Sequence, residues 1–252
     1  MAISVIIPTY NEAEGIADLL TSLQPWRSRG HELIVADGGS SDGTLQAASG
    51  LSDLIMSSRP GRASQMNAGA GQASKDILLF LHADTRLPDT ADTSIGQGLH
   101  AAGLNWGRFD VQLSGRRPVF RLIELLMNRR SRLTHICTGD QAMFVRAGTF
   151  ERLGGFSPLP LMEDIDLSRR LKQHGPPLCL RQKAMTSSRR WEEEGTVRTI
   201  LVMWSLRLAY WLGVSPDRLA RIYYGPKSLS GLRQRGSIIQ EQGVNRRKKT
   251  DG

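Results

Sequence analysis

Short apolar runs that lead into a carboxylate most strongly constrain how this chain can fold. Residues 33–36 and 77–81 are such runs, followed by Asp37 and Asp84, and residues 3–7 form a third apolar run. Apolar runs without polar alternation are typical of strands buried on both faces of a parallel sheet. Ligands bind beyond the carboxyl ends of the strands in open α/β sheets. The pattern therefore predicts a sheet edge suited to a nucleotide and a metal ion.

Helical patterns lie between these strands. The first helix is predicted from one apolar stripe, formed by Ile16, Leu19, Leu20 and Leu23. Asn11 stands where it would cap this helix. Two further helices are expected at 44–48 and 63–70, and a third strand at 54–56. Strands that alternate with helices favour a mostly parallel central sheet flanked by helices, an α/β fold with right-handed crossovers.

The pattern is less regular after Pro88. The sequence predicts strands at 107–113 and 141–145, and helices at 119–133 and 163–173. In the helix at 119–133, one apolar face is expected from Val119, Leu122, Ile123 and Leu126, with arginines around it. We expect one domain over 1–225 that ends in C-terminal helices, followed by a basic, disordered tail over 226–252.

Charge and cysteine content limit the partners and the compartment. The 252 residues carry a net charge of +9, which favours anionic partners such as sugar nucleotides, phosphorylated lipids or membrane surfaces. Cys137 and Cys179 form no CxxC pair, so a zinc site or redox dithiol is not expected. The first residues resemble a strand and not a signal peptide, and a reduced, cytoplasmic location is the expectation.

Two polar segments are candidates for nucleotide binding. Pro8, Thr9, Tyr10, Asn11 and Glu12 follow the first strand, where an aromatic ring and polar groups can hold a base and a ribose. A plain strand-to-helix turn is the alternative. Asp37 can accept hydrogen bonds from a base or ribose, and the glycines that begin with Gly38 allow close backbone approach. The alternative for Asp37 is a turn residue, and no GxGxxG dinucleotide motif is present.

Five further residues carry the candidate chemistry. Asp84 can hold a divalent cation together with substrate phosphates, and His82 is either a second ligand or a structural histidine. Glu163 and Asp164 open a helix, where acids either complement the helix dipole or supply a general base. Arg62 is a candidate phosphate contact, with a solvated surface arginine as the alternative.

Four of these segments together resemble glycosyltransferase family 2. They are residues 5–12, 36–44, 82–84 and 163–164, in the order typical of that family over about the first 190 residues. The resemblance implies a GT-A fold and an enzyme that inverts the anomeric centre while transferring a sugar from a nucleotide-diphosphate donor.

The resemblance also implies residue roles. Asp37 matches the nucleotide-binding acid, Asp84 the last acid of a metal-binding DxD motif for Mn²⁺ or Mg²⁺, and Asp164 the catalytic base of a Glu-Asp pair. His82 stands where the family usually has the first acid of DxD. Ser187 replaces the glutamine of the QxxRW motif of processive synthases, so transfer of one sugar is expected and polymerisation is not.

The acceptor is not encoded in a recognisable motif. A lipid-linked acceptor is one expectation, since the basic helix at 119–133 suits the surface of an anionic membrane, here its cytoplasmic face. The apolar stretch at 197–214 is expected either to pack on the core or to insert into a membrane, and Arg198 and Arg207 disfavour spanning. Two alternatives to a glycosyltransferase remain: a sugar-nucleotide nucleotidyltransferase, and a non-catalytic protein that binds membranes or RNA. For a glycosyltransferase, no nucleic acid is expected as a partner.

Overall fold

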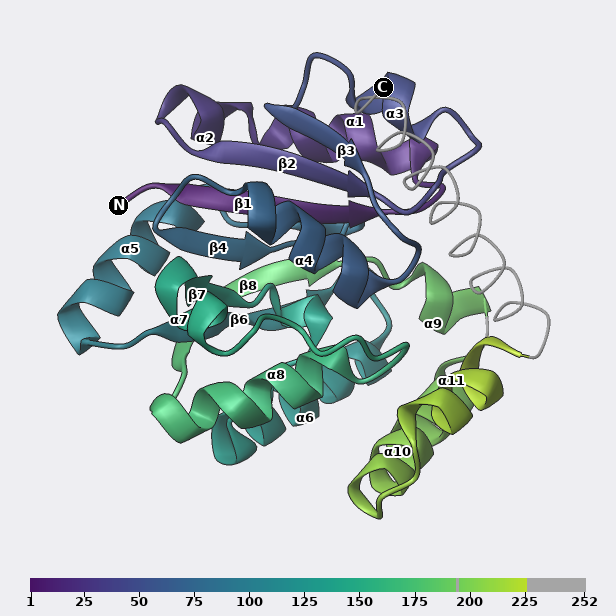
Figure 1. The fold of residues 1–252 in the computed structure, drawn as a ribbon. Coiled ribbons are helices and arrows are strands. Elements are labelled where there is room, and N and C mark those ends of the chain that lie inside the picture. Colours follow the sequence, from purple (N-terminus) through teal and green to yellow (C-terminus); the bar gives the residue numbers. More distant parts are fainter. Residues whose placement is uncertain (194, 226–252) are drawn as a thin grey trace, which may run out of the picture.

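A mixed eight-stranded sheet lies at the centre of the computed structural model, which describes residues 1–193 and 195–225 (Figure 1). The predicted tail at 226–252 lies outside the described residues. The strand order is β3-β2-β1-β4-β7-β6-β8-β5. The strands are β1 (Ile3–Thr9), β2 (Glu32–Asp37), β3 (Leu54–Ser57), β4 (Ile77–Phe80), β5 (Thr85–Arg86), β6 (Trp106–Leu113), β7 (Phe144–Arg146) and β8 (Leu178–Thr186).

The N-terminal half of the sheet is parallel, as predicted. β1 pairs in parallel with β2 and β4, and β2 pairs in parallel with β3. β7 then runs antiparallel to both β4 and β6, while β8 is parallel to β6 and antiparallel to β5. The sheet is therefore mostly parallel, and the carboxyl ends of β1, β2 and β4 share one edge.

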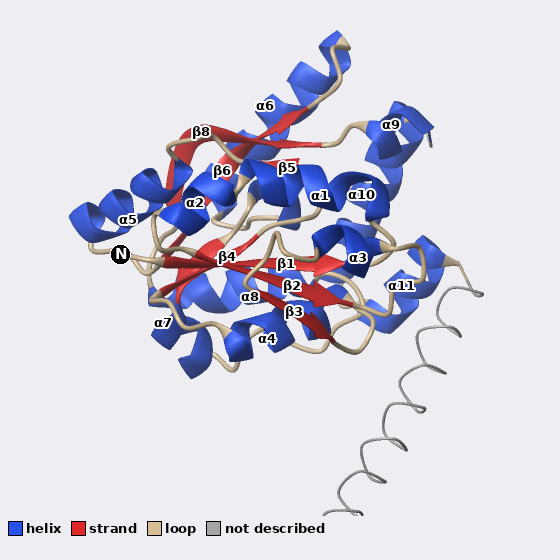
Figure 2. Ribbon diagram, turned by 90° about the horizontal axis from the view of Figure 1, so that it is seen from above, coloured by secondary structure: helices blue, strands red, loops and turns tan. Residues whose placement is uncertain are grey.

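Helices cover both faces of this sheet (Figures 1 and 2). The α-helices are α1 (Ala13–Ser22), α2 (Gln24–Ser28), α3 (Thr44–Ala48), α4 (Arg62–Gln72), α5 (Ala91–Ala102), α6 (Pro118–Thr134), α7 (Ala147–Arg152), α8 (Glu163–Leu171), α9 (Arg189–Glu193), α10 (Thr196–Trp211) and α11 (Pro216–Tyr224). Two short 3₁₀ helices are η1 (Gly139–Gln141) and η2 (Lys172–His174).

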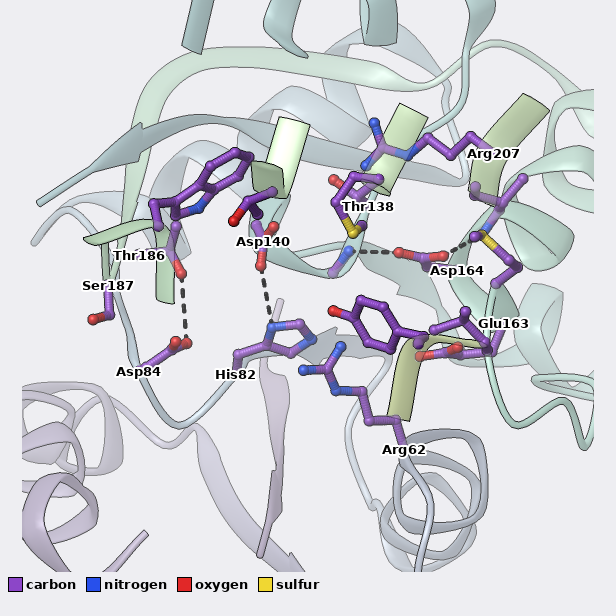
Figure 3. A pocket seen from close by; sticks show the side chains of 18 residues that line it. Arg62, His82, Asp84, Thr138, Asp140, Glu163, Asp164, Thr186, Ser187 and Arg207 are labelled. Atoms are coloured by element: carbon purple, nitrogen blue, oxygen red, sulfur yellow. Dashed lines mark hydrogen bonds and ion pairs between the residues drawn. The ribbon is translucent and has the colours of Figure 1, made fainter. Parts of the chain in front are cut away.

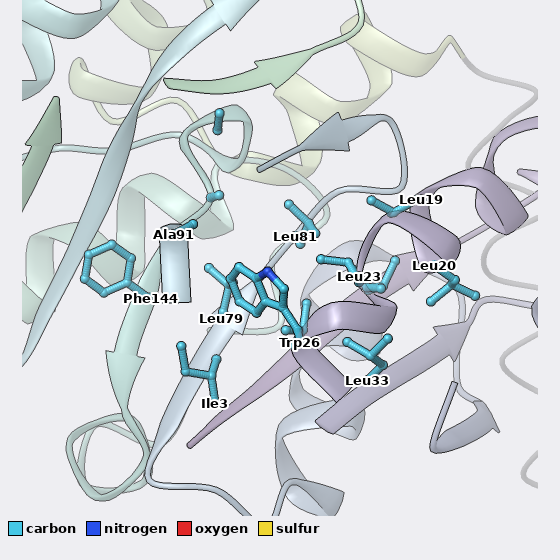
Figure 4. Packing of buried hydrophobic residues seen from close by; sticks show 14 of the residues in the cluster. Ile3, Leu19, Leu20, Leu23, Trp26, Leu33, Leu79, Leu81, Ala91 and Phe144 are labelled. Atoms are coloured by element: carbon cyan, nitrogen blue, oxygen red, sulfur yellow. The ribbon is translucent and has the colours of Figure 1, made fainter. Parts of the chain in front are cut away.

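Alternate side chains of β1 build the two layers of the core. Val5 and Ile7 pack with residues of α1, α2, α3 and α5 on one face, and Ile6 packs with residues of α4, α7 and α8 on the other. The predicted stripe of α1 is buried on the first face, and Figure 4 shows Trp26 of α2 beside it. Strands buried on both sides explain why their sequences lack polar alternation.

The sequence did not reveal α5 and β8. The helical pattern of α5 is interrupted by Gly96 and Gly98, which lower helix propensity. Packing accounts for Gly98, since a Cβ there would lie 2.6 Å from Leu178 Cδ2 of β8. Glycine thus lets α5 lie close against the second half of the sheet.

α6 forms where a helix was predicted, but it buries a different face. Phe120, Ile123 and Met127 pack against β6, whereas Leu122 and Leu126 are 55% and 45% exposed. Of the predicted apolar face, Ile123 is buried, and Val119 is exposed like the two leucines. The buried face also contains two polar residues that the apolar pattern could not identify: Glu124 accepts a hydrogen bond from Leu113 N–H (2.8 Å), and Asn128 from Val111 N–H (2.9 Å).

The apolar stretch at 197–214 forms α10 and the turn that follows it. Leu206 of α10 packs with Leu219 and Ala220 of α11 and with Leu161 and Ile165 at the start of α8. Within the described ranges, no helix combines the length and apolar character that crossing a bilayer requires. The other side of α10 exposes Leu201, Trp204, Leu208 and Trp211.

Candidate active site

Two adjoining cavities open at the carboxyl ends of β1 and β4. The larger, about 510 Å³, lies between the turn after β1 and the start of α4. The smaller, about 150 Å³, is bounded by η1, the start of α8 and α10 (Figure 3). Arg62, His82 and Asp84 line both cavities, so these side chains mark the junction.

The turn after β1 supplies one wall of the larger cavity. Pro8, Thr9, Tyr10 and Glu12 line it, and the Tyr10 side chain is half exposed. Asn11 is outside this lining and adopts a left-handed backbone (φ 55°). Its N–H donates to Ser40 Oγ at 2.8 Å and its Oδ1 accepts from Ser41 N–H at 3.0 Å. The predicted capping role of Asn11 is wrong, because the N-cap of α1 is Glu12.

Asp37 organises the loop after β2. Its carboxylate is buried and accepts hydrogen bonds from the N–H groups of Gly39 and Ser40 at 2.8 Å each and from the hydroxyls of Ser40 and Thr9. Neither cavity has Asp37 or Gly38 among its lining residues. The predicted direct contact of Asp37 and Gly38 with a nucleotide stays a prediction, and the observed geometry gives Asp37 a loop-ordering role.

Gln65 of α4 fixes the position of this loop relative to β1. Its Nε2 donates to the carbonyls of Thr9 (2.6 Å) and Ala36 (2.9 Å). A Cβ on Gly38 would lie 3.1 Å from the same Nε2, so a side chain there would press on this contact. The sequence analysis did not identify Gln65, since a lone glutamine in a small-residue helix carries no motif.

His82 lies against η1. Its Nδ1 is 3.6 Å from Asp140 Oδ1. Burial raises the pKa of Asp140, but His82 and then Arg62 outweigh this effect and hold it below its ordinary value. A Cβ on Gly139 would collide with the His82 ring, so glycine is required for this approach. Asp140 was missed in the sequence, where the predicted strand at 141–145 obscured the η1 turn.

Arg62 provides positive charge at the junction. Burial lowers the pKa of its guanidinium, but the Glu163 carboxylate and the neighbouring Tyr224 and Asp140 outweigh burial and raise it. Arg62 is therefore a permanent cation facing both cavities. Arg62 is exposed and lines both cavities, so its contact with a phosphate stays a prediction.

Asp84 is the exposed carboxylate at the junction. Its Oδ1 accepts from Thr85 Oγ1 (3.3 Å) and Thr186 Oγ1 (3.5 Å), the latter at the end of β8. The pKa of Glu12 is raised, first by burial and then by the charge of Asp84, so the two carboxylates repel each other. A cation between substrate oxygens and Asp84 would relieve this repulsion.

The acidic and histidine side chains near the junction offer few ligands for a metal ion. Within 1–193 and 195–225, no group of three or more His, Cys, Asp or Glu side chains is arranged to hold one. His82 is already paired with Asp140, which weakens its predicted role as a ligand. Asp84 fits a cation held mainly by the oxygens of a bound diphosphate, a common mode for Mg²⁺.

Glu163 and Asp164 differ although they are adjacent at the start of α8. Glu163 is 7% exposed, and burial together with the charge of Asp164 raises its pKa. Asp164 Oδ2 accepts from Gly139 N–H at 2.9 Å, and its Oδ1 accepts from Ile165 N–H at 2.7 Å. These bonds fix the Asp164 carboxylate toward the smaller cavity, across from Arg62 in Figure 3.

Arg207 of α10 also lines the smaller cavity and was considered in the sequence only as an obstacle to membrane insertion. Figure 3 shows it on the same side as Thr138 and Asp164. Arg207 reaches the cavity because α10 and η1 line it together, and no local sequence pattern predicts this arrangement.

Comparison with known proteins places this geometry in a family. A family model described as glycosyl transferase family 2 matches residues 4–150. Glycosyltransferase AglE of Haloferax volcanii is 38% identical over 91 residues, which cover 32% of this chain and 30% of that protein. The undecaprenyl-phosphate 4-deoxy-4-formamido-L-arabinose transferase of Proteus mirabilis is 34% identical over 97 residues, covering 34% of this chain and 30% of that protein. This chain thus spans about a third of the length of either relative.

Solved structures share the fold. Residues 1–349 of S. aureus TarS in complex with UDP-GlcNAc superpose with a TM-score of 0.61 at 20% identity, over 74% of this chain and 58% of that fragment. The mannosyltransferase PcManGT of Pyrobaculum calidifontis, in complex with GDP-Man and Mn²⁺, gives 0.56 at 22% identity, over 73% of this chain and 56% of that one. The predicted GT-A fold is confirmed. Because the family model covers more than half of the chain, this protein belongs to glycosyl transferase family 2.

Proposed function

We propose that this enzyme transfers one sugar from a nucleotide-diphosphate donor to an acceptor hydroxyl, with inversion at the anomeric carbon. The observation that carries the proposal is the junction formed by Arg62, His82 and Asp84. It connects a cavity of about 510 Å³, large enough for part of a nucleotide, to a chamber that contains the Asp164 carboxylate. A donor whose diphosphate lies at the junction would present its sugar to Asp164.

Donor binding follows from the lining of the larger cavity. The ring of Tyr10 and the backbone of Pro8 and Thr9 would contact the base and ribose. Arg62 would receive the charge of the diphosphate. Asp37, with Gly38, would act through the loop that it orders, since its carboxylate is already hydrogen-bonded.

Proton transfer is assigned to Asp164. Its carboxylate takes the proton from the acceptor hydroxyl while the hydroxyl oxygen bonds to the anomeric carbon. The bond from that carbon to the diphosphate oxygen breaks, and the electron pair leaves with the nucleoside diphosphate. Glu163 lies beside it, where burial and the charge of Asp164 raise its pKa.

A divalent cation, Mn²⁺ or Mg²⁺, is proposed at Asp84. When bound, such an ion stabilises negative charge on a leaving diphosphate. Asp84 is suited to hold it because its carboxylate is exposed at the junction. The Mn²⁺ in the PcManGT complex is consistent with this assignment.

A lipid-linked acceptor and peripheral contact with an anionic membrane are also proposed. Exposed apolar side chains on α6 and α10 and the net charge of +9 support membrane contact. The name of the Proteus mirabilis relative includes a lipid phosphate, undecaprenyl phosphate.

The reaction can be tested without the acceptor. A panel of nucleotide sugars with and without Mn²⁺ is followed by NMR for slow hydrolysis, and the first anomer released is identified. We expect one donor to be hydrolysed with inversion, more slowly in Asp164→Asn. Failure to bind or hydrolyse any donor, or release with retention, would contradict the proposal.

A further inference from the structure

A third cavity, the α6–α10 groove, adjoins the smaller active-site cavity. It has a volume of about 390 Å³, and Asp140, Trp191, Met203 and Arg207 line both. The groove extends from these residues between α6 and α10. A molecule in the groove can therefore reach the chamber that contains Asp164.

Most of the groove is apolar. Its walls come from Ile123, Leu126 and Met127 of α6 and from Ile200, Met203 and Trp204 of α10. Leu126 is 45% exposed and Trp204 is 60% exposed, so the groove opens to solvent between two apolar side chains. Such a lining suits an alkyl or isoprenoid chain, which gains about 0.8 kcal/mol for each CH₂ removed from water.

Two arginines and Asp140 are the charged residues of this lining. Arg130 and Arg207 both line the groove. In the described part of the chain, Nε and Nη2 of Arg130 are buried and have no hydrogen-bond partner. Burial lowers the pKa of Arg130 to about 10, and the charge of Arg207 adds to this decrease. A buried guanidinium without an acceptor is costly, so the groove is matched to a ligand that brings an anion.

The remaining charges are compatible with an anion there. Asp140 also lines the groove, but its carboxylate is paired with His82. Asp164 is near enough to raise the pKa of both arginines, and two backbone N–H groups already bond to its carboxylate. The carboxylates that oppose the two guanidinium groups are therefore Asp140, which is paired with His82, and Asp164, which is already hydrogen-bonded, and this leaves positive charge for an anion.

We propose that the α6–α10 groove is the acceptor site and that it selects an amphiphile, an apolar chain linked through a phosphate to a head group that carries a hydroxyl. The chain would lie between α6 and α10, and the phosphate would bind Arg130 and Arg207. The sugar or alcohol hydroxyl beyond the phosphate would then face Asp164. This inference rests on the proposed transfer reaction and adds to it the place where the acceptor binds and the phosphate that the site requires.

Binding of decyl phosphate, at concentrations below those that form micelles, tests the proposal directly. Tryptophan fluorescence follows the titration, since Trp191 and Trp204 line the groove. Decanol, decyltrimethylammonium and inorganic phosphate are titrated in parallel. We expect saturable binding of decyl phosphate, with decanol and inorganic phosphate at least about tenfold weaker and the ammonium compound weakest.

Two matched pairs of variants locate the ligand. Arg130→Gln should weaken the binding of decyl phosphate about tenfold or more, which corresponds to about 1.4 kcal/mol. The affinity of the variant for decyl phosphate should then be close to its affinity for decanol. Arg129→Gln, an exposed neighbour on α6, should not weaken the binding of decyl phosphate. Leu126→Gln should weaken both decyl phosphate and decanol, whereas Leu125→Gln, which is equally exposed but outside the groove, should leave both unchanged.

Several results would overturn the proposal. They are equal affinity of decyl phosphate for the wild type and Arg130→Gln, binding only above the micelle threshold, and equal binding of the cationic compound. A wild-type dimer that Leu126→Gln dissociates would assign the groove to a second copy. Binding of nucleoside diphosphate is measured separately without lipid, so that failure of the donor reaction is distinguished from failure at the groove.

Discussion

At the scale of single residues, side chains that look alike in the sequence differ in how deeply they are buried and in what they contact. Glu163 and Asp164 both line the smaller cavity at the start of α8, yet Glu163 is buried, whereas the Asp164 carboxylate is only half-buried and is held by two backbone N–H groups. Asp37 and Asp84 both follow strands, yet Asp37 is bound by its own loop and Asp84 is exposed at the junction of two cavities. Asp164 and Asp84 are therefore the residues that we propose as base and as metal ligand.

Replacement of the proposed base gives the first prediction. Asp164→Asn keeps the size of the side chain but cannot accept the proton, so turnover should fall by about two to four orders of magnitude. Donor affinity should barely change, because Asp164 is outside the larger cavity. Steady-state kinetics and donor titration measure both. If Glu163→Gln reduces turnover more than Asp164→Asn, the base has been assigned to the wrong carboxylate.

The metal assignment gives the second prediction. Asp84→Ala should abolish the dependence of donor binding on Mn²⁺, since no other exposed carboxylate lines both cavities among the described residues. Donor affinity is measured by calorimetry with and without Mn²⁺. A thermal melt equal to that of the wild type is the control for folding. A variant that keeps the full metal dependence would contradict this role.

At the scale of elements, close packing against the sheet decides where glycine is needed. α4 crosses β1 at Gly69, where a Cβ would lie 2.6 Å from Ile6 Cγ2. Two residues later, a Cβ on Gly71 would meet no atom within 4 Å. The same helix thus contains one glycine that packing requires and one that it does not.

This pair gives the third prediction. Gly69→Ala should destabilise the protein by about 1–3 kcal/mol, because Ile6 is completely buried and cannot move freely. Gly71→Ala should be neutral or stabilising by up to about 1 kcal/mol, since alanine has the higher helix propensity. Urea unfolding of both variants measures the difference. Equal stabilities would show that β1 and α4 can separate at no cost.

Asp92 connects three elements and gives the fourth prediction. It accepts from Arg29 Nε (2.7 Å) and His31 Nε2 (3.0 Å), and His31 Nδ1 accepts from Ile3 N–H of β1 (3.0 Å). Burial raises the pKa of Asp92, but the bonds from Arg29 and His31 outweigh burial and lower it. Asp92→Asn should therefore cost about 1–3 kcal/mol at pH 7.

The pH dependence of this effect has a definite sign. A carboxyl with a lowered folded pKa stabilises the protein above its unfolded pKa, about 3.9, and this stabilisation is lost as pH falls through the folded value. The difference between wild type and Asp92→Asn, measured by urea unfolding, should shrink below pH 4. Asp89→Asn, an exposed neighbour, is the control. A difference that stays constant down to pH 3 would contradict the ionic role.

At the scale of the whole molecule, apolar surface collects at one end. Figure 1 shows α10 and α11 beyond the sheet, and α10 lies beside α6 along the shared groove. Leu122 and Leu125 of α6 and Leu201, Trp204 and Trp211 of α10 are exposed. Exposed apolar residues in such number mark an interaction surface.

Membrane binding is the fifth prediction. Flotation with anionic vesicles should show binding that weakens as salt rises, since the chain carries a net charge of +9. Trp211→Ser should weaken binding at every salt concentration, because this ring is 70% exposed. Equal flotation with neutral vesicles would contradict the charge contribution. Resistance to alkaline extraction would indicate an inserted helix.

The sequence by itself determined the parallel half of the fold and the candidate acids. Apolar runs and the stripe of α1 are local patterns, so β1, β2, β4 and the position of Asp84 at a strand end followed from them. Local patterns failed where long-range packing decides, as in α5 with Gly98 against Leu178.

Only the tertiary structure decided how the site is assembled. The site includes residues from three separate elements: Asp140 of η1, Gln65 of α4 and Arg207 of α10. These elements are distant in the sequence and meet only in the folded chain. The physical reason is that a pattern records which face of an element is apolar, whereas burial, charge and hydrogen-bond partners depend on which elements meet. The difference in burial between Glu163 and Asp164, and the groove lined by Arg130, could therefore be identified only in the folded chain.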